Sequence, residues 1–306
     1  MPRAPPGGCG DHCGQFGGNM TGNLPFKSVL TVITKPAEAA QLVAVAAQVA
    51  RDADGHLDLL CLGIDRDQSG YSVIGAAAMV MQMSLNQAEA EARAAEAATN
   101  AALQAEAPGL RSSVETLVTQ SGVLGTLMAR RARFVDLVVL PRRPAGSVGF
   151  EAETLLEAAL FEAGSPLLVL PPDLHGRAPL QAERIVIGWD QSAAALNAVR
   201  RALPLLKRAA RVSIAVIDPP AHGPERSDPG GTLCQMLVRH GVHAEVSVLA
   251  RTLPRVSDVL VRHVVDLDAG LLVMGAYGHS RLMEAILGGA TRDLLIETEV
   301  PLFMAH

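Results

Sequence analysis

Glycines cluster near the end of the chain, in the segment GAYGHSRLMEAILGG. Gly275 and Gly278 stand where an apolar run ends, while Gly288 and Gly289 interrupt the helical pattern that follows. Glycine lets the backbone approach a ligand closely, and the N–H groups at the start of a helix attract anions. The segment therefore either cradles a phosphate, with a new helix starting at about Ala290, or only turns the chain.

Three apolar runs of the second half, one of them leading into the glycine segment, end in residues that could contact the same ligand. One run ends in Gly188, Trp189 and Asp190, another ends in Val216, Ile217 and Asp218, and the run that leads into the glycine segment ends at Met274. In open parallel sheets, ligands bind beyond the carboxyl ends of the strands, where the strand order reverses. We therefore expect these run ends and the glycine segment to border one crevice.

Alternating strands and helices must position these residues, because short apolar runs alternate with helical stretches along the whole chain. In the second half we expect strands at 183–190, 211–218, 243–250, 269–276 and 300–306, with helices at 192–209, 232–241, 255–267 and 280–298. In the first half we expect strands at 27–34, 57–64, 112–118, 135–141 and 165–171, with helices at 36–52, 83–107, 121–132 and 151–163. Met81 and Met83 are expected to pack at the entry to the helix at 83–107.

The same order of elements occurs twice, and local echoes such as VDLVVLPR and AGLLVMGA fall at the same place in each half. Strands that alternate with helices predict parallel sheets buried on both faces. We predict two tandem, doubly wound, five-stranded parallel-sheet α/β domains that arose by duplication. The expected divisions are a disordered tail at 1–23, a first domain at 24–172, a linker at 173–183 and a second domain at 184–306.

The sequence resembles the universal stress protein family in its tandem form, over nearly all of 24–306. Nucleotide-binding members carry glycine, two residues, glycine, nine residues and glycine after the fourth strand, as Gly275, Gly278 and Gly288 do here. The resemblance implies a Rossmann-like fold similar to that of adenine nucleotide alpha hydrolases. It also implies that Asp190 contacts the adenosine part of a nucleotide.

The resemblance further implies that the backbone of Val216 meets adenine, but two positions depart from the family pattern. Gly289 replaces the usual serine or threonine, and Thr291 could supply the missing hydroxyl. Trp189 replaces a small residue and either stacks on adenine or fills its space. The predicted nucleotide-binding set is Gly188, Trp189, Asp190, Val216, Met274, Gly275, Gly278, His279, Arg281, Gly288, Gly289, Ala290 and Thr291.

The first half lacks this motif. Pro141 stands at the first glycine position, while Lys35 and Pro36 replace the aspartate. We predict that this half has lost nucleotide binding and serves as a structural partner. Arg142 and Arg143 could face an anion, but we expect a solvated pair. A purely structural turn should need the glycines in both halves, so their absence here favours a nucleotide cradle in the second half.

Composition excludes several other classes of function. The chain is 49% hydrophobic and 19% charged with a net charge of −5, which is globular and offers no basic field for nucleic acid. No apolar run is long enough to cross a membrane, and the first residues are not a signal peptide, so we expect a cytoplasmic protein. Cys9, His12 and Cys13 lack a second pair of ligands, so we predict no metal site.

Three functions follow from these observations. The first is a stress-associated regulatory protein that binds ATP, with Mg²⁺ as an optional companion and slow hydrolysis at most. The second is a ligand-free dimerisation or interaction module of the same fold, in which both halves dock into a two-fold-like unit and signal through partners. For either function, the resemblance implies that the short apolar last strands, 165–171 and 300–306, pair with each other, and homodimers can also form. The third, an adenylating enzyme on a related fold, lacks a recognisable catalytic set of residues.

Overall fold

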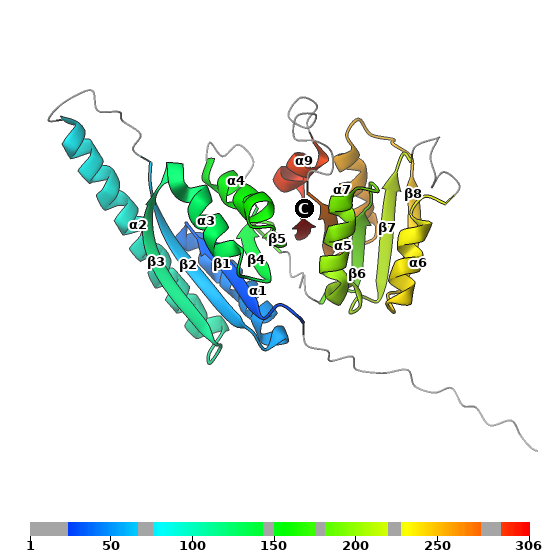
Figure 1. Cartoon of the computed structure of the whole chain (residues 1–306), viewed down its shortest axis with the longest axis horizontal. Coiled ribbons are helices and arrows are strands. Elements are labelled where there is room, and N and C mark those ends of the chain that lie inside the picture. Colours follow the sequence, from blue (N-terminus) through cyan, green and yellow to red (C-terminus); the bar gives the residue numbers. More distant parts are fainter. Residues whose placement is uncertain (1–23, 67–75, 143–149, 175–180, 220–227, 277–288) are drawn as a thin grey trace, which may run out of the picture.

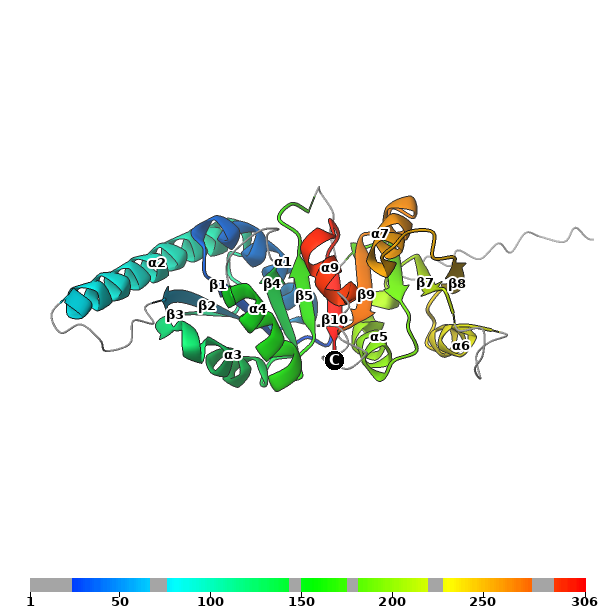
Figure 2. The ribbon, with the colours of Figure 1, turned by 90° about the horizontal axis from the view of Figure 1, so that it is seen from above.

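The chain folds around a single large sheet with helices on both faces (Figures 1 and 2). This computed structural model describes residues 24–66, 76–142, 150–174, 181–219, 228–276 and 289–306. The predicted tail at 1–23, and Gly278, His279, Arg281 and Gly288 of the predicted site, lie outside the described residues.

The first half runs from β1 to β5, and its elements follow the predicted order. The strands are β1 (Ser28–Ile33), β2 (His56–Asp65), β3 (Ser112–Gln120), β4 (Leu137–Pro141) and β5 (Leu167–Leu170). The helices are η1 (Pro36–Glu38), α1 (Ala39–Ala53), α2 (Ala76–Glu106), η2 (Ser121–Val123), α3 (Leu124–Ala132), α4 (Phe150–Glu157) and η3 (Ala158–Glu162).

The second half repeats this order from β6 to β10. The strands are β6 (Arg184–Gly188), β7 (Arg211–Ile217), β8 (Ala244–Leu249), β9 (Leu271–Gly275) and β10 (Leu302–Ala305). The described helices are α5 (Ala193–Leu206), α6 (Gly231–Arg239), α7 (Val256–Asp266) and α9 (Ala290–Glu297).

The ten strands form one sheet in the order β3-β2-β1-β4-β5-β10-β9-β6-β7-β8. Within each half all neighbouring strands are parallel, which confirms the predicted doubly wound α/β fold. The halves meet where β5 and β10 pair antiparallel, with Leu302 opposite Val169 and Phe303 opposite Leu168. The two five-stranded units are therefore continuous at their last strands.

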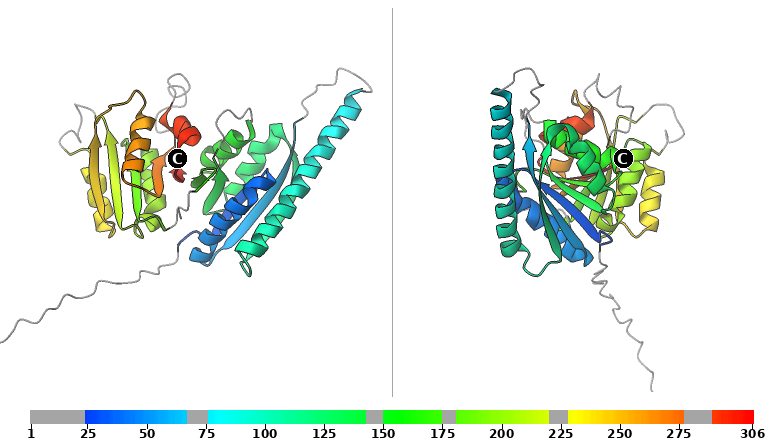
Figure 3. Two further views of the ribbon diagram at one scale, coloured as in Figure 1. Left: turned by 180° about the vertical axis from the view of Figure 1, so that it is seen from behind. Right: turned by 60° about the vertical axis from the view of Figure 1, so that its left-hand side comes forward.

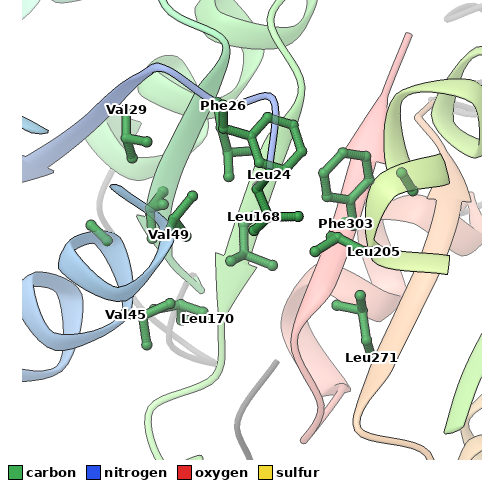
Figure 4. Close-up of a cluster of buried hydrophobic side chains, with 14 of the residues drawn as sticks. Leu24, Phe26, Val29, Val45, Val49, Leu168, Leu170, Leu205, Leu271 and Phe303 are labelled. Carbon is green, nitrogen blue, oxygen red and sulfur yellow. The ribbon is translucent and has the colours of Figure 1, made fainter. Parts of the chain in front are cut away.

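The hydrophobic core is also continuous across this junction. One face of the sheet buries a cluster that includes Phe26 and Leu168 from the first half with Phe303 and Leu205 from the second (Figure 4). The rings of Phe26 and Phe303 lie 6.4 Å apart between centroids. The opposite face buries a second cluster under α3, α4, α7 and α9. Both halves thus bury apolar surface against each other, which is the main favourable contribution to folding.

Helix α2 departs from the prediction. It begins at Ala76 rather than at 83, and its first turns project beyond the end of the sheet (Figure 3). Met81 and Met83 are 56% and 67% exposed, so the prediction that they pack at the helix entry is wrong. Farther along, the backbone of α2 lies so close to β2 that a side chain at Gly63 would collide with the carbonyl oxygen of Ala88.

Candidate functional site

The second half brings the ends of three neighbouring strands to one edge of the sheet. Strand β6 lies between β7 and β9 and is parallel to both, with Gly188 opposite Ala215 on one side and Met274 on the other. The chain winds from β6 toward β8 in one direction and then crosses to β9 on the other side of β6. The strand order therefore reverses between β6 and β9, which is the place where open α/β sheets bind ligands.

Asp190 sits at this reversal point on an exposed turn. One carboxylate oxygen, Oδ1, accepts a hydrogen bond of 2.9 Å from the N–H of Ser192, and Gln191 between them has a φ of 65°. The hydroxyl of Ser192 accepts the N–H of Ala195 at 3.0 Å and caps α5. The turn and the cap together orient the carboxylate toward solvent at the edge of the sheet.

Trp189 directly precedes the exposed Asp190 and packs partly into the core. Its backbone N–H donates to the carbonyl of Ala215 at 3.0 Å, and its half-buried ring packs against the cluster on the α5 side of the sheet. The indole Nε1 is buried and, among the residues described, has no hydrogen-bond partner. The ring therefore contributes to core packing, while its one polar atom is left without a partner in this part of the chain.

Packing alone accounts for the missing side chain at Gly275 and restricts Gly188 only weakly. A Cβ built on Gly275 would lie 2.4 Å from the backbone nitrogen of Ala195 and 2.7 Å from the carbonyl carbon of Ala194, at the start of α5. A Cβ on Gly188 would lie 3.1 Å from a methyl group of Leu260. Gly275 must be glycine for α5 to approach β9, whether or not a ligand binds.

Helix α9 begins at Ala290, which confirms the predicted helix start. Gly289 is its N-cap, with φ −73° and ψ 143°, and its carbonyl accepts the N–H groups of Arg292 and Asp293 at 3.0 and 3.2 Å. Thr291, the candidate for the missing hydroxyl, is only 3% exposed.

The start of α9 lies at the same edge of the sheet as Asp190. The carboxylate of Asp293 accepts the hydroxyl of Ser257 at 3.1 Å, which joins the first turns of α9 and α7. Because α7 follows β8, both helices start at the carboxyl ends of the strands. Arg255 also pairs with Asp293 at 3.8 Å and with Glu297 at 2.7 Å.

The matching place in the first half is occupied by protein. Lys35, after β1, pairs with Glu38 of η1 at 3.6 Å. Between the ends of β1 and β4, a cavity of about 30 Å³ is lined by Lys35, Glu38, Pro141 and Arg142 among others, with room for about two water molecules. This cavity is far too small for a nucleotide.

The prediction that Arg142 is solvated is wrong, because its side chain is hydrogen-bonded to the other half of the chain. Its guanidinium Nη1 donates to the carbonyl oxygens of Ile296 and Thr298, at 2.6 and 2.9 Å, in the other half of the chain. Burial lowers the pKa of this guanidinium, and the charge of Glu299 partly opposes that shift. Sequence reasoning missed this role because no local pattern links residues that are 154 positions apart. Arg143 lies outside the described residues.

Other kinds of site find no support in the described part of the chain. No group of three or more His, Cys, Asp or Glu side chains there is arranged to hold a metal ion. A search of the same residues finds no helix with the length and hydropathy needed to span a membrane.

The fold defines a doubly wound α/β protein, with a reversal of strand order between β6 and β9 in its second half. The model of the universal stress protein family matches residues 181–306, so the chain contains a domain of that family. A curated relative, Universal stress protein Slr1230 of Synechocystis sp. (strain ATCC 27184 / PCC 6803 / Kazusa), is 34% identical over 71 residues. That match covers 23% of this chain and only 24% of the relative.

Solved structures extend the likeness in fold to both halves. A universal stress protein from Archaeoglobus fulgidus DSM 4304 superimposes with a TM-score of 0.62 at 14% identity, over 91% of this chain and 95% of that one. A functionally unknown protein, PA1789 from Pseudomonas aeruginosa PAO1, gives a TM-score of 0.50 at 17% identity, over 92% of each chain. At these identities the likeness concerns the fold alone.

Proposed function

We propose that the second half binds an adenine nucleotide, ATP, and that the protein acts as a nucleotide-responsive regulator in the stress response. One observation carries the proposal: an exposed, oriented carboxylate at Asp190 and the start of α9 share the edge of the sheet where the strand order reverses. A carboxylate can accept the hydroxyl or amino groups of adenosine, and a helix start can bind its phosphates.

Each part of the nucleotide has residues assigned to it. Asp190 contacts the adenosine part, and the backbone at Val216, near the end of β7, meets adenine. The phosphates lie along the path from Gly275 to the N–H groups after Gly289, with Mg²⁺ as their counter-ion. His279 and Arg281, together with Gly278 and Gly288, belong to this path but fall outside the described residues.

The first half acts as a structural partner without a nucleotide site. Its crevice holds the Lys35–Glu38 ion pair and the stem of Arg142, and the remaining cavity is about 30 Å³. We also propose that residues 173–183 link two domains and that the two halves arose by duplication.

A ligand-free interaction module is the second candidate, and three observations favour it. Gly275 is required by the backbone of α5, so it does not by itself point to a ligand. The ring of Trp189 packs against the core, and the first turn of α9 already has a negative partner in Asp293. In this case the pairing of β5 with β10 serves to join the halves, and signalling depends on a protein partner or on homodimers.

Thermal unfolding with and without ATP and Mg²⁺ separates the two candidates. A ligand at about 100 times its Kd stabilises the folded state by about 2.7 kcal/mol, which gives a readily measured rise in Tm. Asp190→Asn keeps an acceptor for the N–H of Ser192 but removes the charge. We expect it to weaken ATP binding about tenfold or more, because a hydrogen bond to a charged group contributes about 1.5–3 kcal/mol.

The matched control is Asp268→Asn. Asp268 is an exposed turn residue between α7 and β9, at the opposite edge of the sheet, and its side chain is 80% exposed. This change should leave ATP binding unaltered. Loss of the ATP effect in both variants, or in neither, would show that Asp190 does not contact the nucleotide. A wild-type protein that shows no Tm shift at millimolar ATP and Mg²⁺ would favour the ligand-free module.

A further inference from the structure

Arg142 connects the first half of the chain to helix α9 of the second half. It directly follows β4, where its backbone N–H donates to the carbonyl of Leu170 at 2.6 Å. Its side chain then reaches the carbonyl oxygens of Ile296 and Thr298 at the end of α9. The last carbonyl groups of a helix lack partners within the helix and carry partial negative charge, so a guanidinium stabilises them.

In the part of the chain that the structure describes, the contact in the opposite direction is of a different kind. Ala276 occupies the place after β9 that Arg142 occupies after β4, since its N–H donates to Ala305 at 2.9 Å. An alanine side chain cannot reach a neighbouring helix end. Both helices are also closed by their own chain: Thr298 donates to the carbonyl of Leu294 at 3.1 Å, and in the first half Ala163 and Ser165 donate to the carbonyls of residues 158 and 159 at 3.0 Å.

The second half contacts the matching helix through the ring of His306, whose Nδ1 lies 2.9 Å from the carbonyl oxygen of Ala276 and whose ring meets that of Phe161 of η3 edge-on, with centroids 4.9 Å apart. Among the described residues, the hydrogen bonds of Arg142 to the end of α9 therefore differ in kind from the contact made in the opposite direction.

Helix α9 depends on such contacts because it is only eight residues long. A helix of that length is not stable on its own in water, so tertiary contacts must fix its position. Arg255 holds its outer side through Asp293 and Glu297. Arg142 holds its carboxyl end from the other half, in a partly buried setting where a hydrogen bond from a charged donor is strong. A shift at that end of a two-turn helix moves its first N–H groups as well.

We propose that Arg142 is a positioning residue through which the first half controls nucleotide binding by the second. This inference rests on the proposed function, because the opposite end of α9 is the proposed phosphate site. Arg142 touches no nucleotide: it sets the place of the helix whose first N–H groups would meet the phosphates. Since coupling between sites is reciprocal, nucleotide binding should also tighten the contact between the halves.

The test uses the full-length protein with Arg142→Met, which keeps much of the stem and removes the charge and donors. Arg208→Met is the matched control, because Arg208 also bridges the halves, through an ion pair with Asp52 of α1 at 2.8 Å. Isothermal titration with ATP and Mg²⁺ should show binding weakened about 5- to 150-fold in Arg142→Met. Arg208→Met should bind within about twofold of the wild type. Arg142→Lys, which keeps one donor and the charge, should be intermediate and remains informative if Arg142→Met folds poorly.

Hydrogen exchange without nucleotide gives a second and independent readout. The amides of α9 should exchange faster in Arg142→Met than in the wild type, while those of α7 should not change. Equal weakening of ATP binding by both substitutions, or unchanged binding and exchange in a folded Arg142 variant, would overturn the inference. If the wild type binds no ATP, the proposed function and its control by Arg142 both fail. Faster exchange in α9 would then support only the role of Arg142 in holding the helix.

Discussion

Replacing Gly275 with alanine tests whether the first glycine of the motif is required by the fold itself. The new Cβ would lie 2.4 Å from the nitrogen and 2.8 Å from the Cα of Ala195, and 2.7 Å from the carbonyl carbon of Ala194. Favourable contacts between carbon atoms lie at about 3.5–4.0 Å, so the first turn of α5 must retreat by about 1 Å. Because these atoms are backbone, no rotamer change can relieve the collision.

The expected loss of stability follows from this geometry. Overpacking a core by a methyl group costs about 1–3 kcal/mol, and a rigid backbone neighbour places Gly275→Ala at about 3 kcal/mol. Gly188→Ala meets the end of the Leu260 side chain at 3.1 Å, which can move, so about 1 kcal/mol is expected. Gly122→Ala meets nothing within 4 Å and should change stability by no more than about 0.5 kcal/mol.

Urea unfolding followed by circular dichroism, without nucleotide, measures all three variants. The free energy of unfolding should fall in the order Gly122→Ala, Gly188→Ala, Gly275→Ala. A Gly275→Ala protein within 0.5 kcal/mol of the wild type would refute the reasoning. It would mean that α5 does not approach β9 as closely as the structure has it, and a ligand would again be the simplest reason for the glycine.

Two further predictions concern the core and the pH dependence of stability. Phe303→Ala removes a fully buried ring at the junction of the halves and should lower the free energy of unfolding by about 3–5 kcal/mol, measured by urea unfolding. His263 bonds the buried Ser213 through Nε2 at 3.0 Å, and burial lowers its pKa although Asp266 and Glu245 oppose the shift. The unfolded state therefore takes up a proton first, so stability should fall as the pH drops below about 6.5. His263→Gln should reduce this dependence, seen as a smaller difference between urea midpoints at about pH 7.5 and 5.5, and an unchanged difference would count against it.

The strands could be predicted because short, continuous apolar runs are typical of parallel strands that are buried on both faces. β1, β4 and β9 each fall within two residues of the predicted ranges, since strands buried on both faces have no polar side to blur the pattern. The start of α2 was less predictable. Ala76–Met83 contains good helix formers and no helix breaker, so the helix extends past the sheet that its pattern was expected to cover.

Contacts across the two halves could not be predicted from sequence. The Arg142 contact joins residues more than 150 positions apart, and an arginine after a strand is equally compatible with solvent. The need for Gly275 depends on how close α5 comes to β9, which no local pattern encodes. The strand-end position of Asp190, by contrast, follows from the parallel topology alone, and the structure places it where the sequence predicted the edge of the sheet.

The glycine at 275 changes how the absence of the motif from the first half should be interpreted. Pro141 ends β4 opposite Leu170 as Gly275 ends β9 opposite Ala305, so the two residues are equivalent. In the first half Pro141 lines a small cavity with Lys35 and Glu38, whereas in the second half the start of α5 lies too close to Gly275 for any side chain. Because packing requires Gly275 in the second half, the absence of a glycine from the first half is no evidence for a ligand. The argument for a nucleotide site therefore rests on Asp190 and the start of α9, and Asp190→Asn tests it more directly than any change of a glycine.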